Sequence, residues 1–200
     1  MRSRLKVHNT PSATAAKVAL RQHVLDRVSP ARVLDAFCGG GVMYGAVWRK
    51  AKAYVPCDSA RWAPGDPVRF VCDNRRLLRC LDLGDFNVFD FDAFGSPWEQ
   101  VLILAARRRW GRGERGALVV TDGSPLQLRW GEMSHALREL SGLLTLKCAP
   151  TLAGTDELRR LAVAGFARRA GVKLLKQWEA AGRGRAQERY AAMVFEGAGP

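Results

Sequence analysis

The sequence lacks the residue patterns of a metal site. Its five cysteines form no C-x-x-C pair, and its three histidines show neither metal-ligand nor catalytic-triad spacing. We therefore predict no metal centre. Cys38, Cys57 and Cys72 lie in or beside apolar, strand-like segments, and we interpret them as small buried hydrophobic residues.

Long hydrophobic runs are also missing. No apolar segment reaches the roughly 20 residues that a membrane-spanning helix needs. The basic residues 1–6 are not followed by the apolar stretch of a signal peptide. We therefore expect no membrane partner and a cytoplasmic location.

Acidic residues are scarce relative to basic ones. The 200 residues include 32 Lys and Arg but only 19 Asp and Glu, which gives a formal net charge of +13. Positive charge of this size attracts polyanions, and the planar guanidinium group of arginine suits phosphate. The charge predicts a nucleic-acid partner, with a solvated basic surface as the alternative. We expect phosphate contacts from the basic loop near the C-terminus, through Arg183, Arg185 and Arg189.

What the sequence does contain is a regular alternation of short apolar segments with segments of helical spacing. An N-terminal helix is expected between Ser12 and Val28, and the later helices are expected to lie between successive strands. The expected parallel strands are residues 32–37, 53–58, 68–72, 86–92 and 116–121. The expected later helices are residues 41–50, 75–81, 98–110 and 156–170. This alternation is typical of a parallel, doubly wound α/β sheet.

The C-terminal segment has a different pattern. Two strands, 172–178 and 190–195, are joined by a connection too short for a helical crossover, so they should be antiparallel. We predict one α/β domain over residues 1–200, with a Rossmann-like, mostly parallel seven-stranded sheet that ends in an antiparallel hairpin. Residues 1–30 would form an N-terminal cap and helix, and residues 31–200 the core.

A glycine-rich segment, Asp35-Ala36-Phe37-Cys38-Gly39-Gly40-Gly41, follows the first strand. This is where a doubly wound sheet holds its ligand, and glycines let a ligand approach the backbone. The dinucleotide fingerprint G-x-G-x-x-G is not met, so a nicotinamide oxidoreductase is a weaker alternative, as is a turn with a purely structural role. The Asp35 carboxylate can instead face the cationic aminoacyl end of S-adenosylmethionine.

Further acids end the second and third strands. Asp58 lies at about the 20-residue spacing after Asp35 at which an acid meets ribose hydroxyls in Rossmann-like folds. Asp73 and Asn74 end the third strand. Strand ends often carry Asp as a turn former, so it is the three acids together that indicate a cofactor site. The expected cofactor-binding residues are Asp35, Ala36, Phe37, Gly39, Gly41, Asp58, Ser59, Asp73, Asn74 and Asp90.

The fourth strand ends in Asp90-Phe91-Asp92-Ala93-Phe94-Gly95-Ser96-Pro97, without the Pro-Pro-Tyr/Phe signature of amino-directed DNA methyltransferases. It resembles the Asp-x-Asp-Pro-Phe-Gly-Ser/Thr-Pro run of tRNA guanine N2-dimethyltransferases. The segment Thr121-Asp122-Gly123-Ser124-Pro125-Leu126 is similar to that family's Thr-Asp-Thr-Ala-Pro-Leu. These are class I S-adenosylmethionine-dependent methyltransferases, and the resemblance to their catalytic domain covers about residues 33–196.

The sequence departs from that family in two ways. Ala93 replaces the family's proline, and the chain ends where the family continues into a C-terminal domain that contacts tRNA. The reaction is therefore expected to carry over better than the substrate. A separate substrate-recognition partner protein is an open alternative.

The resemblance implies roles for the residues of the fourth-strand motif. We expect the catalytic residues to be Asp92, Phe94 and Gly95. Asp92 would accept hydrogen bonds from the amine of a base and take up its developing positive charge. Phe94 would stack on an extruded base, or else belong to the core. Asp90, with the opposite strand parity, would support the loop or touch the cofactor, and Asp73 or its neighbouring backbone would hold the adenine amino group.

The combined prediction is an S-adenosylmethionine-dependent N-methyltransferase that acts on an amine of a nucleic-acid base. RNA is the leading substrate, and guanine N2 of tRNA is the expectation at family level. An amino-directed DNA methyltransferase is the first alternative. A non-catalytic nucleic-acid-binding protein with the same fold is an alternative from another class.

Overall fold

The structure is a computed structural model, and it describes residues 10–60, 69–145, 154–181 and 188–199. Within these residues, seven strands form one sheet in the order β3-β2-β1-β4-β5-β7-β6. The strands are β1 Arg32–Asp35, β2 Ala53–Asp58, β3 Phe70–Val71, β4 Val88–Phe91, β5 Arg115–Asp122, β6 Val172–Ala181 and β7 Arg189–Gly197. The first five strands pair in parallel, whereas β7 runs antiparallel to both β5 and β6. The predicted fold class is confirmed.

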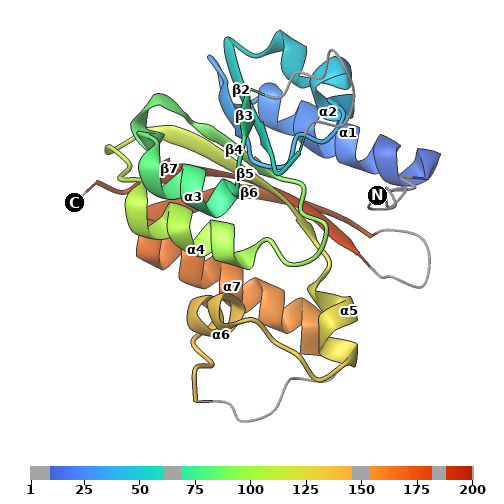
Figure 1. The fold of residues 1–200 in the computed structure, drawn as a ribbon. Coiled ribbons are helices and arrows are strands. Elements are labelled where there is room, and N and C mark those ends of the chain that lie inside the picture. Colours follow the sequence, from blue (N-terminus) through green and yellow to red (C-terminus); the bar gives the residue numbers. More distant parts are fainter. Residues whose placement is uncertain (1–9, 61–68, 146–153, 182–187, 200) are drawn as a thin grey trace.

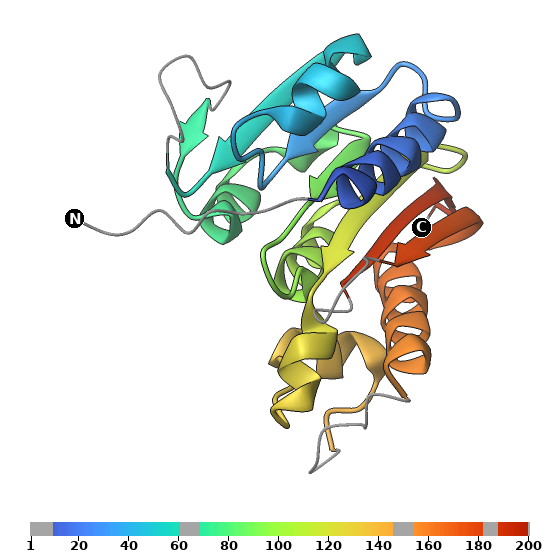
Figure 2. The same cartoon turned by 90° about the vertical axis from the view of Figure 1, so that its right-hand side faces the viewer.

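Helices flank the sheet on both faces (Figure 1). The α-helices are α1 Pro11–Leu25, α2 Val42–Ala46, α3 Asn74–Cys80, α4 Trp98–Arg107, α5 Ser124–Arg129, α6 His135–Ser141 and α7 Thr155–Ala170. Two short 3₁₀ helices are η1 Trp48–Lys50 and η2 Leu83–Asp85. In Figures 1 and 2, α1 and α2 lie on one face of the sheet, and α3, α4 and α7 lie on the other.

Alternating side chains of the strands supply two separate cores, because successive residues of a strand point to opposite faces. Leu34 and Phe89 pack with the apolar residues of α3, α4, α6 and α7. Val33 and Val88, their neighbours in sequence, pack with those of α1, α2 and η1. The central strands are thus buried on both faces, as their continuous apolar sequence predicted.

The position of the ligand crevice follows from the order of the strands. After β1 the chain crosses to β2 and β3 on one side, and then returns to β4 on the other side of β1. In open α/β sheets, ligands bind at such a reversal, outside the carboxyl ends of the strands. Asp35 of β1 and Asp90 of β4 are paired in the register, so the two strand-end acids lie side by side.

Several boundaries differ from the expected ones. α1 ends at Leu25, three residues before the expected Val28, and the expected helix over residues 41–50 is divided into α2 and η1. α4 ends at Arg107, because Trp110 turns back into the core, where its ring centroid lies 4.8 Å from that of Phe195.

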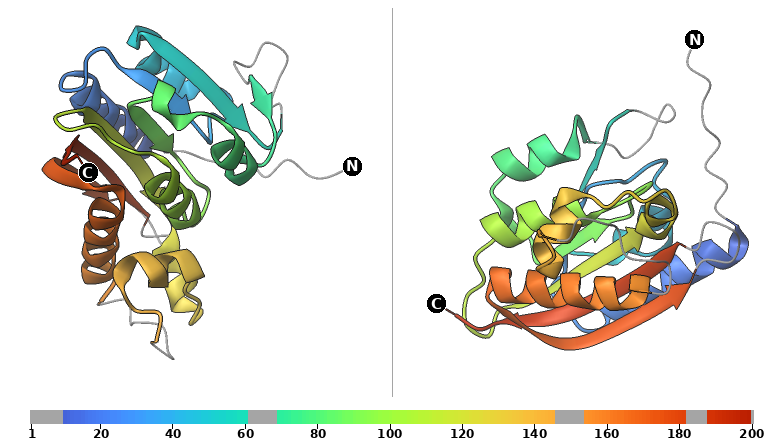
Figure 3. Two further views of the ribbon diagram at one scale, coloured as in Figure 1. Left: turned by 90° about the vertical axis from the view of Figure 1, so that its left-hand side faces the viewer. Right: turned by 90° about the horizontal axis from the view of Figure 1, so that it is seen from below.

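The sequence reasoning missed α5 and α6. Figure 3 shows them beyond the carboxyl end of β5, beside α7. A glycine allows α6 and α7 to come close together: a Cβ built on Gly165 of α7 would lie 1.7 Å from the carbonyl oxygen of Leu140 of α6. α5 and α6 thus lie at the same end of the sheet as the strand-end acids.

Candidate active site

A cavity of about 390 Å³ lies at the carboxyl ends of β1, β2 and β3. Six of the ten expected cofactor-binding residues line it, together with two residues that the sequence reasoning missed. The six are Ala36, Phe37, Asp58, Ser59, Asp73 and Asn74, and the two are Arg75 and Gln100. The fold therefore gathers residues from three successive strand ends around one hollow.

The glycine segment adopts a backbone conformation that favours glycine. Gly39 and Gly41 have positive φ angles of 51° and 78°, a conformation that residues with a side chain rarely adopt. The N–H of Gly39 donates to Oδ2 of Asp58 at 2.9 Å, which ties the segment to the end of β2. Oδ1 of Asp58 accepts longer hydrogen bonds, both at 3.3 Å, from the hydroxyl of Ser59 and the N–H of Ala60, and the side chain still lines the cavity.

Three amide groups form a chain of hydrogen bonds beneath the cavity. Nδ2 of Asn74 donates to the carbonyl oxygen of Ala36 at 3.1 Å, and Nε2 of Gln100 donates to Oδ1 of Asn74 at 2.8 Å. The backbone carbonyl fixes the orientation of both side-chain amides, since it can only accept. Oε1 of Gln100 is left buried, with no hydrogen-bond partner among the described residues. Gln100 is a single polar residue on an otherwise apolar helix face, which was the one available sequence signal.

Asp73 lies at the rim of the cavity and caps α3. Its carboxylate accepts hydrogen bonds from the backbone N–H and the guanidinium of Arg75, and these bonds lower the pKa of Asp73 to about 2. Both side chains are close to half exposed. This acid is therefore ionised, and its charge is already shared with a neighbouring cation.

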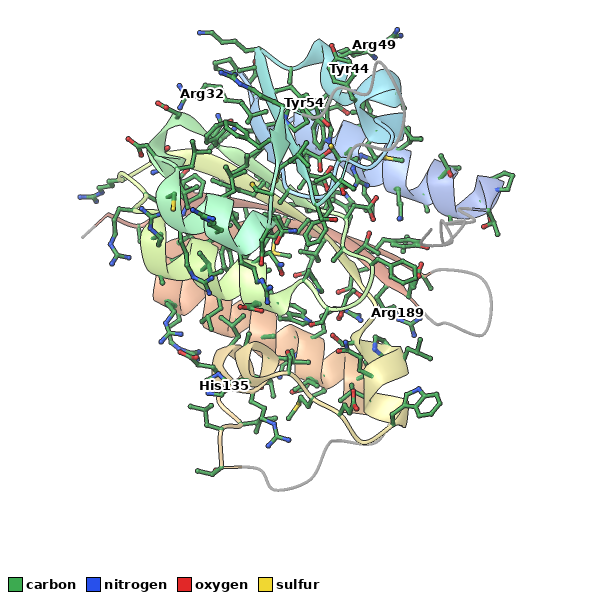
Figure 4. The ribbon with its side chains drawn as sticks, in the orientation of Figure 1. Arg32, Tyr44, Arg49, Tyr54, His135 and Arg189 are labelled. Atoms are coloured by element: carbon green, nitrogen blue, oxygen red, sulfur yellow. The ribbon has the colours of Figure 1, made fainter. Side chains whose placement is uncertain are left out.

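Asp35 lies inside the protein and is only 2% exposed. Its carboxylate accepts hydrogen bonds from the hydroxyl of Tyr54 at 2.9 Å and from the N–H of Phe37 at 3.1 Å. Burial, together with the charge of Asp90, raises the pKa of Asp35 well above its ordinary value. Tyr44 of α2 packs against Tyr54, with ring centroids 4.8 Å apart (Figure 4). A cation bound near this group would favour its ionised form.

Asp90 is completely buried beside β1. The guanidinium of Arg21, on α1, donates to both carboxylate oxygens at 2.7 Å, and the indole N–H of Trp48 donates to Oδ2 at 2.7 Å. Burial raises the pKa of Asp90, and the hydrogen bonds from Arg21 oppose that effect. Three hydrogen-bond donors from two side chains thus hold its carboxylate in place.

Asp92 lies one residue beyond β4, and its side chain is 15% exposed. Nζ of Lys17 donates to its Oδ1 at 2.7 Å, and Oγ1 of Thr121 donates to the same oxygen at 2.5 Å. Nη2 of Arg21 lies 3.4 Å from Oδ2. Burial alone would raise the pKa of Asp92, but the two cations and the two hydrogen bonds outweigh it, so the pKa is lowered. Asp92 is an anion at neutral pH.

The loop after Asp92 presents an aromatic ring to solvent. Phe94 is 80% exposed, so it is no core residue. Gly95 has a φ of 120°, and its carbonyl oxygen accepts a hydrogen bond from the N–H of Gly123 at 2.7 Å. A Cβ on Gly123 would lie 3.0 Å from Gly95. The loops after β4 and β5 are therefore in direct contact.

The expected phosphate-binding residues are described only in part. Arg183 and Arg185 lie outside the described residues. Arg189 begins β7, opposite Asp122 at the end of β5, and Figure 4 shows it close to α5. Its Nε lies 3.5 Å from an oxygen of Asp156. Arg189 is thus on the same edge of the sheet as the acids.

Two further results concern the described part of the chain. No helix there is long and apolar enough to cross a membrane. In the same residues, no group of three or more histidine, cysteine or acidic side chains is arranged to hold a metal ion.

No protein-family model matches the chain, and no curated protein sequence matches it. Solved structures do resemble it. The 1,6-didemethyltoxoflavin-N1-methyltransferase of Burkholderia thailandensis, solved with 1,6-didemethyltoxoflavin and S-adenosylhomocysteine, superposes with a TM-score of 0.52 and 18% identity over 93% of this chain and 78% of that protein.

Two more methyltransferases solved with S-adenosylhomocysteine are similar. The N-methyltransferase NodS of Bradyrhizobium japonicum WM9 has a TM-score of 0.56 and 12% identity, over 96% of this chain and 91% of that one. The magnesium protoporphyrin IX methyltransferase of Synechocystis PCC 6803 has a TM-score of 0.51 and 14% identity, over 92% and 82%. The chain has the class I methyltransferase fold. At these identities the likeness shows the fold and leaves the substrate open.

Proposed function

We propose that this chain is an S-adenosylmethionine-dependent methyltransferase that methylates an amine of a nucleic-acid base, with RNA as the substrate class. One observation carries the proposal: the anionic Asp92 lies at the carboxyl end of β4, on the same edge of the sheet as a cavity whose lining suits a nucleoside. The three methyltransferases of the same fold described above were all solved with S-adenosylhomocysteine, which supports this cofactor.

The side chains around the cavity fit the adenosine part of that cofactor. Asp58 supplies a carboxylate that can accept from ribose hydroxyls. Oε1 of Gln100 is a buried acceptor that has no partner among the described residues, and a purine amino group can satisfy it. Gly39 leaves the backbone open to a ligand, because nothing lies within 4 Å of where its Cβ would be. When bound, the cofactor supplies an electrophilic methyl group on a sulfonium sulfur.

Asp35 fits the positively charged end of the same ligand. The carboxyl group lies under the glycine segment and is held by Tyr54 and Phe37. Its raised pKa means that its ionisation is unfavourable while no cation is near. Asp35 thus acts on the cationic end of the ligand through its charge, from a buried position under the glycine segment. Asp58, which lines the cavity, can contact the ligand directly.

In this proposal, Asp92 has the chemical role that the sequence predicted for it. An exocyclic base amine is a poor nucleophile, because its lone pair is conjugated into the ring. A carboxylate that accepts its N–H hydrogen bonds orients that lone pair and stabilises the positive charge that develops on nitrogen. Oδ1 of Asp92 accepts hydrogen bonds from Lys17 and Thr121, whereas Oδ2 has the longer, 3.4 Å contact with Nη2 of Arg21, so we assign Oδ2 to the amine.

The loop that follows Asp92 provides a platform for a flat substrate. Phe94 is exposed next to the reacting position, where a base removed from its stack can lie against the ring. The net charge of +13 favours a polyanionic substrate, and the resemblance of the Asp90–Pro97 segment to tRNA guanine N2-dimethyltransferases supports RNA within that class.

The proposal is tested by incubating the protein with S-adenosylmethionine labelled on its methyl group. Total tRNA, ribosomal RNA and duplex DNA are supplied in separate reactions, and the modified nucleoside is identified after digestion. We expect label in an N-methylated nucleoside from RNA. Label in duplex DNA alone would favour the DNA methyltransferase alternative, and label in none of the three would refute the proposed acceptor class.

A further inference from the structure

The N-terminal helix places two cations inside the candidate active site. α1 begins after Thr10, whose hydroxyl accepts a hydrogen bond from the N–H of Ala13, and Pro11 occupies its first turn. The face that packs on the sheet carries the apolar Leu20 and Val24. This helix is held on the protein by ordinary hydrophobic packing.

Lys17 and Arg21 lie one turn apart on that same packed face. They are only 5% and 1% exposed, and charged residues this deeply buried are rare unless they are paired. Their partners are the two acids of β4: Lys17 binds Asp92, and Arg21 binds Asp90 through both arms of its guanidinium. The contacts join residues that are 75 and 69 positions apart in the sequence.

We propose that Lys17 and Arg21 are positioning residues for methyl transfer, which hold the Asp92 carboxylate with Oδ2 directed toward the acceptor amine. This inference rests on the proposed function and adds α1 to its active centre. Arg21 fixes Asp90 and reaches Oδ2 of Asp92 at 3.4 Å, while Lys17 and Thr121 immobilise Oδ1. Oδ1 is thereby anchored by two hydrogen bonds, and Oδ2, whose contact with Arg21 is longer, is the oxygen assigned to the substrate.

The charged and titratable groups around Asp92 come from three elements. Lys17 and Arg21 face it from α1, Asp90 from β4, and Tyr190 from β7, where the ring lies 5.3 Å from Nζ of Lys17. Two cations outweigh the one other carboxylate, so Asp92 remains an anion. Removal of the Lys17 charge should shift that balance and raise the pKa of Asp92.

The test compares Lys17→Met and Lys17→Gln, which remove the charge, with Lys17→Arg, which retains it. Lys52→Met is the matched control, because Lys52 is exposed and adjoins the opposite end of β2. The pKa of Asp92 is read by ¹³C NMR of carboxyl-labelled aspartate, with its resonance assigned by its loss in Asp92→Asn. Methyl transfer to RNA is measured as a function of pH, and binding of S-adenosylhomocysteine by calorimetry.

We expect the charge-removing variants to raise the pKa of Asp92 and to move the acidic limb of the rate profile to higher pH. At pH 7 kcat should fall about 10- to 100-fold, with cofactor affinity unchanged, because the defect is one of positioning. Lys17→Arg should largely restore both readouts. Lys17→Gln keeps a hydrogen-bond donor to Asp92. If Lys17→Met fails to fold, this variant still shows whether the charge of Lys17 controls the pKa of Asp92.

An Asp92 pKa and a rate profile that are the same in Lys17→Gln, Lys52→Met and the wild type would overturn the inference. The NMR titration needs no methyl acceptor. If the wild-type protein transfers no methyl group, the proposed function fails, and the titration still decides whether Lys17 controls Asp92.

Discussion

Two arginine–aspartate pairs lie at the carboxyl edge of the sheet, and they differ mainly in burial. The side chains of Arg21 and Asp90 are 1% and 0% exposed, whereas those of Arg75 and Asp73 are 45% and 47% exposed. In the exposed pair, solvent screens the charges and the side chains can rearrange around a ligand. In the buried pair, each charge depends on the other. The buried pair, Arg21 and Asp90, can therefore serve as a fixed support. The exposed pair, Arg75 and Asp73, can serve as an adjustable wall of the cavity.

Loss of the buried cation should have the largest effect. Arg21→Met leaves Asp90 buried with only Trp48 as a donor, so we expect a loss of about 3–5 kcal/mol in the free energy of unfolding. Urea denaturation measures this. The matched variant Arg75→Met should leave the denaturation midpoint close to that of the wild type. Equal losses in both variants would remove the distinction between the two pairs.

Replacement of the candidate catalytic carboxylate should have the next largest effect. Asp92→Asn keeps the shape but removes the negative charge, and we expect methyl transfer to fall about 10²- to 10⁴-fold. Binding of S-adenosylhomocysteine should persist, because Asp92 does not line the nucleoside cavity. Transfer at close to the wild-type rate would exclude Asp92 from its proposed role.

A change in the wall of the nucleoside cavity should have a smaller effect, and it should alter only the affinity for the cofactor. Gln100→Leu removes the donor to Asn74 and the free acceptor, and we expect the affinity for S-adenosylhomocysteine to fall about 10-fold. Calorimetry compares this variant with Gln177→Leu, whose amide binds Glu179 on β6. If both variants bind S-adenosylhomocysteine as tightly as the wild type, Gln100 does not contribute to the affinity of the cavity for this ligand.

The strand-end acids also predict opposite dependences of stability on pH. The pKa of Asp92 is lowered, so its stabilisation is present above its unfolded pKa of about 4 and is lost as the pH falls through the folded value. The pKa of Asp35 is raised, mainly by burial. The stability that Asp35 contributes is therefore fully present below its unfolded pKa, and it is lost as the pH rises through the folded value.

Asp35→Asn should therefore stabilise the protein near pH 7, by about 0.5–2 kcal/mol, and weaken cofactor binding. Thermal unfolding between pH 4 and pH 8 measures the first effect, and the gain over the wild type should grow as the pH rises. A variant that is less stable than the wild type throughout this range would show that the buried carboxyl does not oppose folding.

Much of the cofactor side of the site could be predicted from the sequence, because its signals are local. Asp58 and Asp73 each follow an apolar strand, and parallel strands bring their carboxyl ends to one edge. The same argument predicted the position of the glycine segment at the end of the first strand. Gln100 escaped prediction, since its partner Asn74 lies on another helix.

The class of fold, the antiparallel end of the sheet and the strand that Asp92 follows could all be read from the sequence. These follow from short-range patterns of apolar residues, glycines and turns. Which cations reach Asp90 and Asp92, by contrast, depends on the packing of the whole chain. Lys17 and Arg21 have the spacing of any pair of residues on one face of a helix, and their role depends on how α1 packs against the sheet. That packing joins residues distant in sequence, for which no local pattern exists.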